Sequence, residues 1–360
     1  MQDRLMSRWL SPLLAFCMSL VLITSLAPML GFQIDRQFDF WLLWLLIVLV
    51  VSLPLTYLEY ALVKRAKTSI LNAFMMLTRE ADAAFQWRIV GWLSVIFIPF
   101  LAGALLNNSY TLIGQFVHLP IRSELVFLVL AMFAMLLSFA PRLWLAGVSV
   151  VAVLVSWATS YVFGYAPLVW HTTNIVFSEW GSATVLALIA SGLGLGIYAQ
   201  TSLHQILNTE RSSQLVIPVW LAQVFAVVVF GFFTIRADIP ALTFLLAVVF
   251  AAAWLLQLAR QQLIERNINV IAVYLIILGA LLIWVIPHAH RLFNLVLMLW
   301  GLVSCLLYSL FAGWMMKISH LRKVLNFSNE IYYNLWRIAV RIVAPLSIIV
   351  AICAVFAGYF

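Results

Sequence analysis

The residues most suited to binding or proton transfer are one carboxylate and a run of alternating glycines, and both lie inside apolar segments. Glu59 is the one carboxylate well inside such a segment. A buried carboxylate is expensive in lipid, so we expect Glu59 to face the interior of a helix bundle, hydrogen-bonded or protonated. Two roles stay open for it: a structural brace between helices, or a group that takes up and releases a proton.

The glycine run is Ser191-Gly-Leu-Gly-Leu-Gly196. Glycine weakens a helix and lets the backbone turn, so this run predicts an interruption near Gly192 to Gly196. The same glycines would also suit close packing of helices without any site.

Other reactive side chains form no recognisable catalytic pattern. Cys17, Cys305 and Cys353 all lie in apolar runs, where cysteine is best interpreted as a small packing residue rather than a disulfide partner or metal ligand. The sequence shows no clustered His/Asp metal motif, no Ser-His-acid constellation and no phosphate loop at usable spacing. An integral-membrane enzyme is therefore the weakest of the functional hypotheses.

Composition defines the elements that must position these groups. Charged residues make up 9% of the chain and apolar ones 66%, whereas a soluble domain carries roughly a quarter charged residues. Long apolar runs in lipid must be helical, because only helices satisfy their own backbone. We predict an all-α polytopic membrane protein in one transmembrane domain (1–360), with about eleven spans at 9–32, 38–62, 88–112, 123–140, 142–163, 182–202, 214–235, 240–264, 268–286, 292–316 and 335–358.

The basic residues predict the orientation of these spans. With the N-terminus inside, sixteen of the 20 Lys and Arg residues fall on the inner side and four on the outer side. The positive-inside rule thus favours a cytoplasmic N-terminus and an outer C-terminus in a bacterial cytoplasmic membrane. The net charge of +8 is explained by this topology, which removes the argument for a nucleic-acid partner. The loop from Lys64 to Gln86 has apolar residues at helical spacing and predicts a helix along the inner interface.

Several stretches resemble the neurotransmitter:sodium symporter family. The second span ends in Leu53-Pro54 followed by Glu59, Ala61 and Leu62, a basic loop comes next, and the third span opens with Trp87-Arg88, Gly91, Trp92 and Leu93. The glycine run lies in the sixth span, where the family has a serine- and glycine-rich break. Phe311-Ala-Gly-Trp314 is similar to the end of the family's tenth helix, and Leu335-Trp-Arg to Ala344-Pro345 is similar to the start of its eleventh.

The resemblance implies two inverted repeats of five helices, about 9–163 and 182–316, with a peripheral helix at 335–358. Helices one and six would be broken at the bilayer midplane and would bind a solute and ions there. The break in helix one would fall in Leu22 to Pro28, where the family's glycines, asparagine and arginine are missing but Thr24, Ser25 and Pro28 remain. An ordinary proline near a helix end is the alternative interpretation of Pro28.

The resemblance also implies where ligands would lie. The substrate-binding candidates are Thr24, Ser25, Ser191, Gly192, Gly194 and Gly196, and the ion-binding candidates are Ser25, Gln223 and Glu59. Sodium prefers oxygen ligands. In the eighth helix, where the family supplies hydroxyls, this chain has only Ala252, Ala253, Trp254, Leu255 and Leu256. We therefore expect eroded sodium sites, with no cofactor other than Na+ or H+ as a coupling ion.

Two functions from different classes follow. The first is a secondary transporter of a small, amino-acid-like solute. The second is a non-transporting membrane scaffold or accessory subunit that keeps the fold, working in a homodimer or with another membrane partner.

Overall fold

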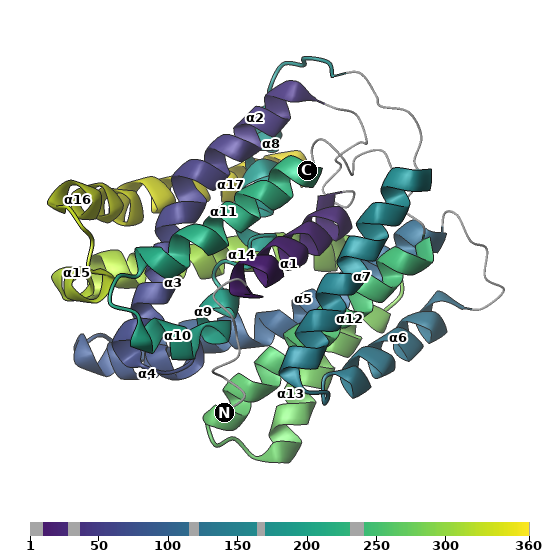
Figure 1. Cartoon of the computed structure of the whole chain (residues 1–360), viewed down its shortest axis with the longest axis horizontal. Helices are drawn as coiled ribbons and strands as arrows, with labels where there is room; N and C mark the ends of the chain where they lie inside the picture. The colour runs from purple at the N-terminus through teal and green to yellow at the C-terminus, as the bar shows by residue number, and fades with distance from the viewer. Residues whose placement is uncertain (1–9, 28–36, 115–121, 164–169, 231–240, 360) are drawn as a thin grey trace.

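The computed structural model describes residues 10–27, 37–114, 122–163, 170–230 and 241–359, whose regular secondary structure is helical apart from one bridge between Gln37 and His171 (Figure 1). The helices are α1 Leu10–Leu26, α2 Phe38–Ile47, α3 Leu53–Ala66, α4 Ile70–Glu80, α5 Ile89–Gly114, α6 Ser123–Leu137, α7 Arg142–Phe163, α8 Phe177–Ile189, α9 Ile197–Thr201, α10 Leu203–Asn208, α11 Ser213–Val229, α12 Ala241–Glu265, α13 Val270–Leu282, α14 His290–Leu310, α15 Ser319–Leu325, α16 Glu330–Ile338 and α17 Ala344–Tyr359. The π-helical turns Val48–Ser52 and Ala339–Val343 join α2 to α3 and α16 to α17.

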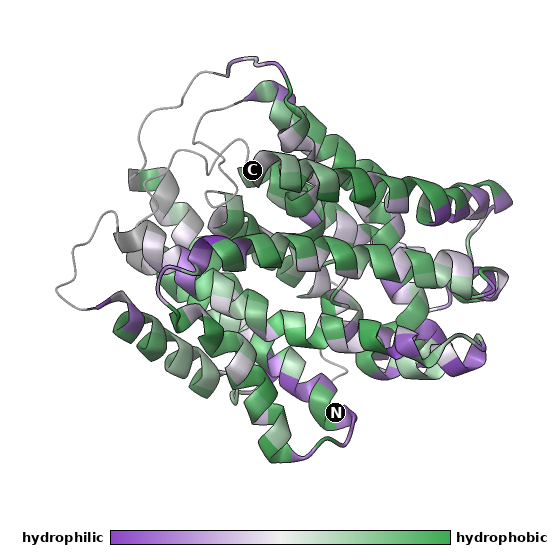
Figure 2. Ribbon diagram, turned by 180° about the vertical axis from the view of Figure 1, so that it is seen from behind, coloured by the Kyte–Doolittle hydropathy of each residue, from purple (hydrophilic) through white to green (hydrophobic). Residues whose placement is uncertain are grey.

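Five helices among the described residues are long and apolar enough to cross a membrane. They are Phe38–Ala66, Phe85–Thr111, Thr243–Glu265, His290–Met315 and Glu330–Gly358, and six shorter apolar helices lie at other predicted spans. Hydrophobic residues cover most of the helix surfaces, and hydrophilic ones gather near the ends (Figure 2). The chain is therefore a multi-pass membrane protein. The full count of eleven spans and the two repeats stay predictions.

Helix α1 lies at the centre of the bundle. It contacts α11, α7, α5, α12, α8 and α9, and almost every residue from Leu14 to Leu26 is buried. A helix that is apolar and buried on all sides belongs in the middle of a large bundle rather than at its surface. Helices α5 and α12 pack against each other beside α1, and α17 packs on α8 (Figure 1).

Tryptophan side chains satisfy backbone carbonyls between helices. The indole N–H of Trp220 donates to the Val48 carbonyl in the first π-helical turn at 3.1 Å, and that of Trp336 donates to the Pro54 carbonyl at 3.1 Å. A backbone carbonyl oxygen has two lone pairs, so it can accept an indole N–H in addition to its helical partner. In lipid each such carbonyl needs a partner inside the protein, and the indoles supply it while filling space between helices.

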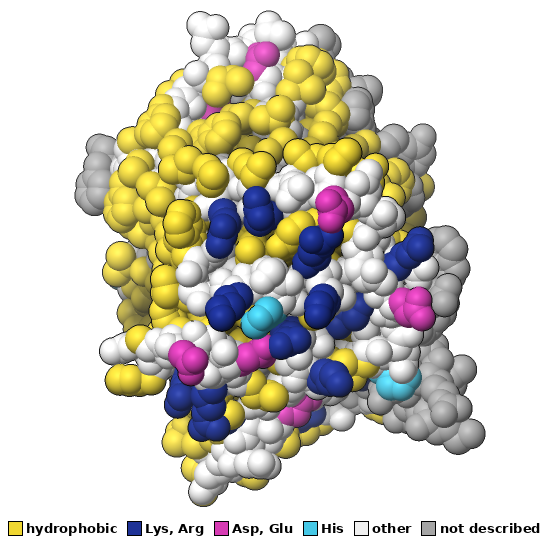
Figure 3. Space-filling view, turned by 90° about the vertical axis from the view of Figure 1, so that its left-hand side faces the viewer, with side chains coloured by type: hydrophobic (Ala, Val, Ile, Leu, Met, Phe, Trp, Pro, Cys, Tyr) yellow, Lys and Arg dark blue, Asp and Glu magenta, His cyan; other side chains and the backbone are white. Residues whose placement is uncertain are grey.

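One end of the molecule is basic. Figure 3 shows Lys and Arg side chains gathered on the end where α4, α15 and α16 lie, bordered by hydrophobic surface. Adjoining hollows at this end are lined by Lys64, Lys67, Arg211, Arg322 and Lys323. These five residues all belong to the side that the charge count placed in the cytoplasm.

The orientation is directly testable. We expect a reporter fused after Phe360 that is active only in the cytoplasm to stay inactive, because an odd number of spans puts the two termini on opposite sides. The same reporter placed after Arg79, in the basic loop, should be active. Activity of the fusion after Phe360 would contradict the eleven-span prediction.

The helix predicted between Lys64 and Gln86 is present as α4. Its apolar face does not lie open: Ile70, Ala73, Phe74 and Leu77 are all buried against the bundle. The Phe74 ring lies 4.8 Å from that of Tyr308, between centroids. Because the protein covers this face, α4 is part of the folded core, and its position along a membrane interface stays a prediction.

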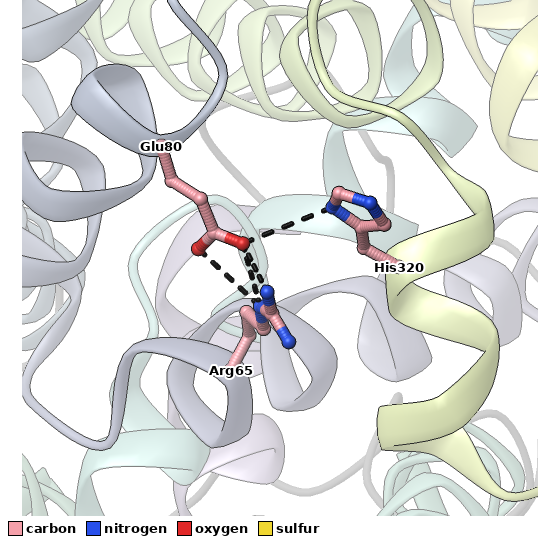
Figure 4. Close-up of polar contacts among 3 residues, drawn as sticks. All are labelled: Arg65, Glu80 and His320. Atoms are coloured by element: carbon pink, nitrogen blue, oxygen red, sulfur yellow. Dashed lines mark hydrogen bonds and ion pairs between the residues drawn. The ribbon is translucent and has the colours of Figure 1, made fainter.

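Polar contacts connect the end of α4 to α3 and α15. Glu80 pairs with Arg65 at the end of α3, and its Oε1 lies 3.8 Å from Nδ1 of His320 on α15 (Figure 4). These side chains are partly exposed, and exposed pairs contribute less than about 1 kcal/mol to stability. The cluster therefore fixes how three segments meet more than it stabilises the fold.

Candidate functional site

The predicted interruption of the sixth span is present. Helix α8 ends at Ile189, α9 begins at Ile197, and Gly192, Gly194 and Gly196 between them have φ of +64°, +78° and +65°. The chain closes α8 with bonds from the Gly192 N–H to Ile189 and from the Leu193 N–H to Leu188. The helical ladder resumes when Gln200 donates to the Gly196 carbonyl at 2.8 Å. We call residues 190–196 the break.

Glu59 on α3 binds the break directly. Its Oε1 accepts the Gly194 N–H at 2.6 Å and the Gly196 N–H at 3.3 Å, and the side chain is 2% exposed. Both N–H groups would otherwise be unpaired, because the helical ladder is interrupted here. The expectation that Glu59 lies buried and hydrogen-bonded in the bundle therefore matches its geometry, and the brace role has concrete partners.

Gln223 meets the break from α11. Its Nε2 donates to the Ser191 carbonyl at 3.0 Å, and the side chain is fully buried. Its Oε1 is buried too and has no hydrogen-bond partner among the described residues. A buried amide oxygen without a donor is costly, so this atom is a natural contact for a cation, a water or a polar solute.

The first helix is continuous over part of the stretch where a break was predicted. Helix α1 runs from Leu10 to Leu26, and the Thr24 hydroxyl donates back to the Leu20 carbonyl at 2.8 Å. The helix ends at Leu26 and Pro28 lies outside the described residues, so a break at the end of this stretch stays a prediction.

Ser25 faces α5 rather than the break. Its Oγ lies 3.3 Å from the Ser109 Oγ and 3.5 Å from the Leu105 carbonyl oxygen. The predicted ion ligands Glu59 and Gln223 thus share the break as a partner, while Ser25 has its own partners on another helix. Ala104 and Leu105 on α5 are both fully buried beside it.

Sequence reasoning missed a row of polar residues that continues from Ser25. Asn108 Nδ2 donates to Asn294 Oδ1 on α14 at 3.2 Å, and Asn107 Nδ2 donates to Asn108 Oδ1 at 3.4 Å. Together with Ser109 they connect α1, α5 and α14 through hydroxyls and amides that are buried on α1 and α5 and half-buried at Asn294. The signal was visible, since Asn107-Asn108-Ser109 is a polar triplet inside a long apolar run.

Helix α12 presents carbon to the interior at the positions where the family has hydroxyls. Ala252, Ala253, Leu255 and Leu256 are fully buried, and so is Trp254, whose Nε1 has no partner among the described residues. Helix α12 packs against α1, so this apolar stretch lies at the core of the bundle.

Comparison with solved structures finds a protein with the same fold. The crystal structure of MhsT in complex with L-phenylalanine superposes with a TM-score of 0.63, covering 98% of this chain and 99% of that chain, at 14% sequence identity. No protein-family model and no curated protein matches the chain. The likeness shows the fold alone, and it supports the symporter-like architecture predicted from the sequence.

Proposed function

We propose that this chain is a secondary transporter of a small, amino-acid-like solute. The observation that carries the proposal is the break between α8 and α9, buried inside a multi-pass helical protein with the fold of MhsT. Broken helices supply backbone groups that bind solutes and ions within a membrane. MhsT was crystallised with L-phenylalanine, so an amino acid is the first solute to test.

The geometry narrows which groups of the break can meet a solute. The N–H groups of Gly194 and Gly196 are occupied by Glu59, and the Ser191 carbonyl is occupied by Gln223. In the proposed site the solute contacts the Ser191 side chain and Gly192. Thr24 and Ser25 are not part of it, because the Thr24 hydroxyl is bonded to the Leu20 carbonyl and Ser25 faces α5. The unpaired Oε1 of Gln223 then contacts either the solute or a coupling ion.

The coupling ion is the subject of a second prediction. Uptake should not depend steeply on sodium, because the family's helix-eight oxygens are replaced by carbon and a buried indole at Trp254. Transport would then be weakly sodium-dependent, driven by protons through Glu59, or uncoupled. Uptake into vesicles with sodium or choline outside, each with and without an imposed pH gradient, separates these cases. Steep sodium dependence that survives in Glu59→Gln would overturn the prediction.

A non-transporting scaffold or accessory subunit is the second candidate. The fully buried Trp254 and the hydroxyl-free stretch around it favour this reading, because they leave the core of α12 without ligands for an ion. Such a protein would keep the fold for a membrane partner or a second copy of itself.

One experiment tests transport against this alternative. The purified chain is reconstituted in vesicles and offered labelled neutral, acidic and basic amino acids, beginning with L-phenylalanine. Uptake above that of protein-free vesicles supports transport, and it should be lost in Gly194→Ala and retained in Gly279→Ala. No uptake of any solute by well-folded protein would favour the scaffold.

A further inference from the structure

Three buried hydroxyls lie beside the break, and the proposed solute contacts do not use them. They belong to Ser19 on α1, Tyr60 on α3 and Tyr198 on α9, whose side chains are no more than 2% exposed. None of the three hydroxyls has a hydrogen-bond partner among the described residues. A buried hydroxyl without a partner is costly, so these three indicate a small ligand that both donates and accepts hydrogen bonds.

The three hydroxyls lie close to one another between helices. Helix α9 packs against both α1 and α3. The Tyr198 side chain lies near Ser19 and Tyr60, and the Tyr60 hydroxyl faces Ser202, the residue that follows α9. These groups approach one another without forming hydrogen bonds. Polar groups arranged in this way are joined by bridging water, and buried water characteristically satisfies polar groups that the protein leaves unpaired.

Ser202 extends the group toward the end of the molecule that the charge count places in the cytoplasm. Its Oγ donates to the Ser11 Oγ at 3.0 Å, in the first turn of α1, and both serines are buried. Leu13 and His204, each two residues away from one of these serines, are exposed. The hydroxyls therefore reach from the break to the surface of the bundle. We call this set the hydroxyl row: Ser19, Tyr60, Tyr198, Ser202 and Ser11.

The other end of the hydroxyl row lies at Glu59. Tyr60 follows Glu59 directly on α3, and Tyr198 lies in the first turn of α9, immediately after the break that Glu59 binds. The other titratable groups that face Glu59 are the Cys305 thiol and the Tyr308 phenol on α14. Thiols and phenols are neutral near pH 7, so these neighbours hold no charge that would fix the Glu59 carboxyl in one protonation state.

We propose that the hydroxyl row binds a chain of water molecules through which Glu59 exchanges a proton with the inner side of the membrane. This inference rests on the proton-driven form of the proposed transport. A hydroxyl or a water accepts one proton while it donates another, so the row conducts a proton without gaining charge. The Glu59 carboxyl gives its proton to the water beside Tyr60, and the water beside Ser11 releases one to the inner solution. The carboxylate then remains on Glu59.

Radiolytic footprinting tests the water chain without any transport. An X-ray pulse forms hydroxyl radicals from bound water, the radicals oxidise neighbouring aromatic rings, and mass spectrometry of the purified full chain locates the products. Tyr60 and Tyr198 should be oxidised several-fold faster than Tyr308, which is as deeply buried but whose hydroxyl is paired with Ser94 at 2.9 Å. Equal rates at all three tyrosines would overturn the water chain.

The variant Tyr60→Phe/Tyr198→Phe tests the proton path. It removes two hydroxyls that no described residue pairs with, so the protein should fold as the wild type does. In vesicles it should lose uptake driven by an imposed pH gradient. It should keep the exchange of labelled for unlabelled solute at equal pH, because exchange needs no net proton movement. Tyr308→Phe is the matched control and should keep both activities.

The outcomes separate the proton path from the proposed function. Gradient-driven uptake that survives in Tyr60→Phe/Tyr198→Phe would overturn the path and leave the transporter assignment intact. A well-folded wild type that neither accumulates nor exchanges any solute would overturn the transporter assignment and the proton path with it. Footprinting decides in either case whether the hydroxyl row holds water.

Discussion

Replacing Glu59 with leucine should destabilise the protein by about 2–6 kcal/mol, because two buried N–H groups lose their acceptor at about 1–3 kcal/mol each. Those groups are the N–H of Gly194 and the N–H of Gly196, in a stretch with no helical partners to replace the carboxylate. Thermal unfolding of the purified protein, followed by tryptophan fluorescence, should show a midpoint lowered by roughly 3–8 °C. Solute uptake should be lost as well, since the break would no longer be held.

Two further variants make this result interpretable. Thr56→Val is the matched control one turn earlier on α3. It removes a hydroxyl that donates to the Ser52 carbonyl, so no buried N–H group loses its acceptor. Glu59→Gln keeps an oxygen that accepts the same two N–H groups, so a pure brace should tolerate it. If Glu59 also carries the transported proton, the Gln variant folds but no longer responds to a pH gradient. A Glu59→Leu variant as stable as Thr56→Val would show that another group satisfies the break.

The sequence predicted those features that follow from local chemistry. The apolar runs are helical, the glycine run interrupts a helix, and Glu59 is a buried hydrogen-bond acceptor. Each of these follows from the residue itself: an apolar run of this length must be helical in lipid, glycine permits positive φ, and a buried carboxylate needs donors.

Features that depend on partners distant in sequence were harder to predict. Helix α1 is continuous through Thr24 and Ser25, and the break that the family resemblance implies near Pro28 lies outside the described residues. The contact between Ser25 and Ser109 spans 84 positions, and nothing in either segment identifies the other. The sequence likewise cannot show that Oε1 of Gln223 has no hydrogen-bond donor, because this depends on how α11 packs against the break.

Replacing Gly194 with alanine should cost about 2–5 kcal/mol, from two separate sources. Its φ of +78° is a left-handed conformation that costs a residue with a side chain roughly 1–2 kcal/mol. The added Cβ would also lie 2.9 Å from the Cys305 Sγ and 3.1 Å from the Cys305 backbone nitrogen on α14, and overpacking of this kind costs about 1–3 kcal/mol. The sulfur can shift, but the backbone nitrogen belongs to a packed helix and moves only if α14 moves.

The matched control is Gly279→Ala on α13, where the added Cβ meets nothing within 4 Å and alanine should be neutral or stabilising by up to about 1 kcal/mol. The double variant Gly194→Ala/Cys305→Ala removes the sulfur contact but leaves the backbone contact and the unfavourable φ, so it should recover only part of the loss. The thermal midpoints and the solute uptake of the three variants are measured together. The difference between the single and the double variant gives the contribution of the sulfur contact, and the loss that remains comes from the backbone contact and the unfavourable φ. Gly194→Ala with the midpoint of the wild type would mean that the break adopts another conformation, in which the Gly194 N–H is no longer held by Glu59.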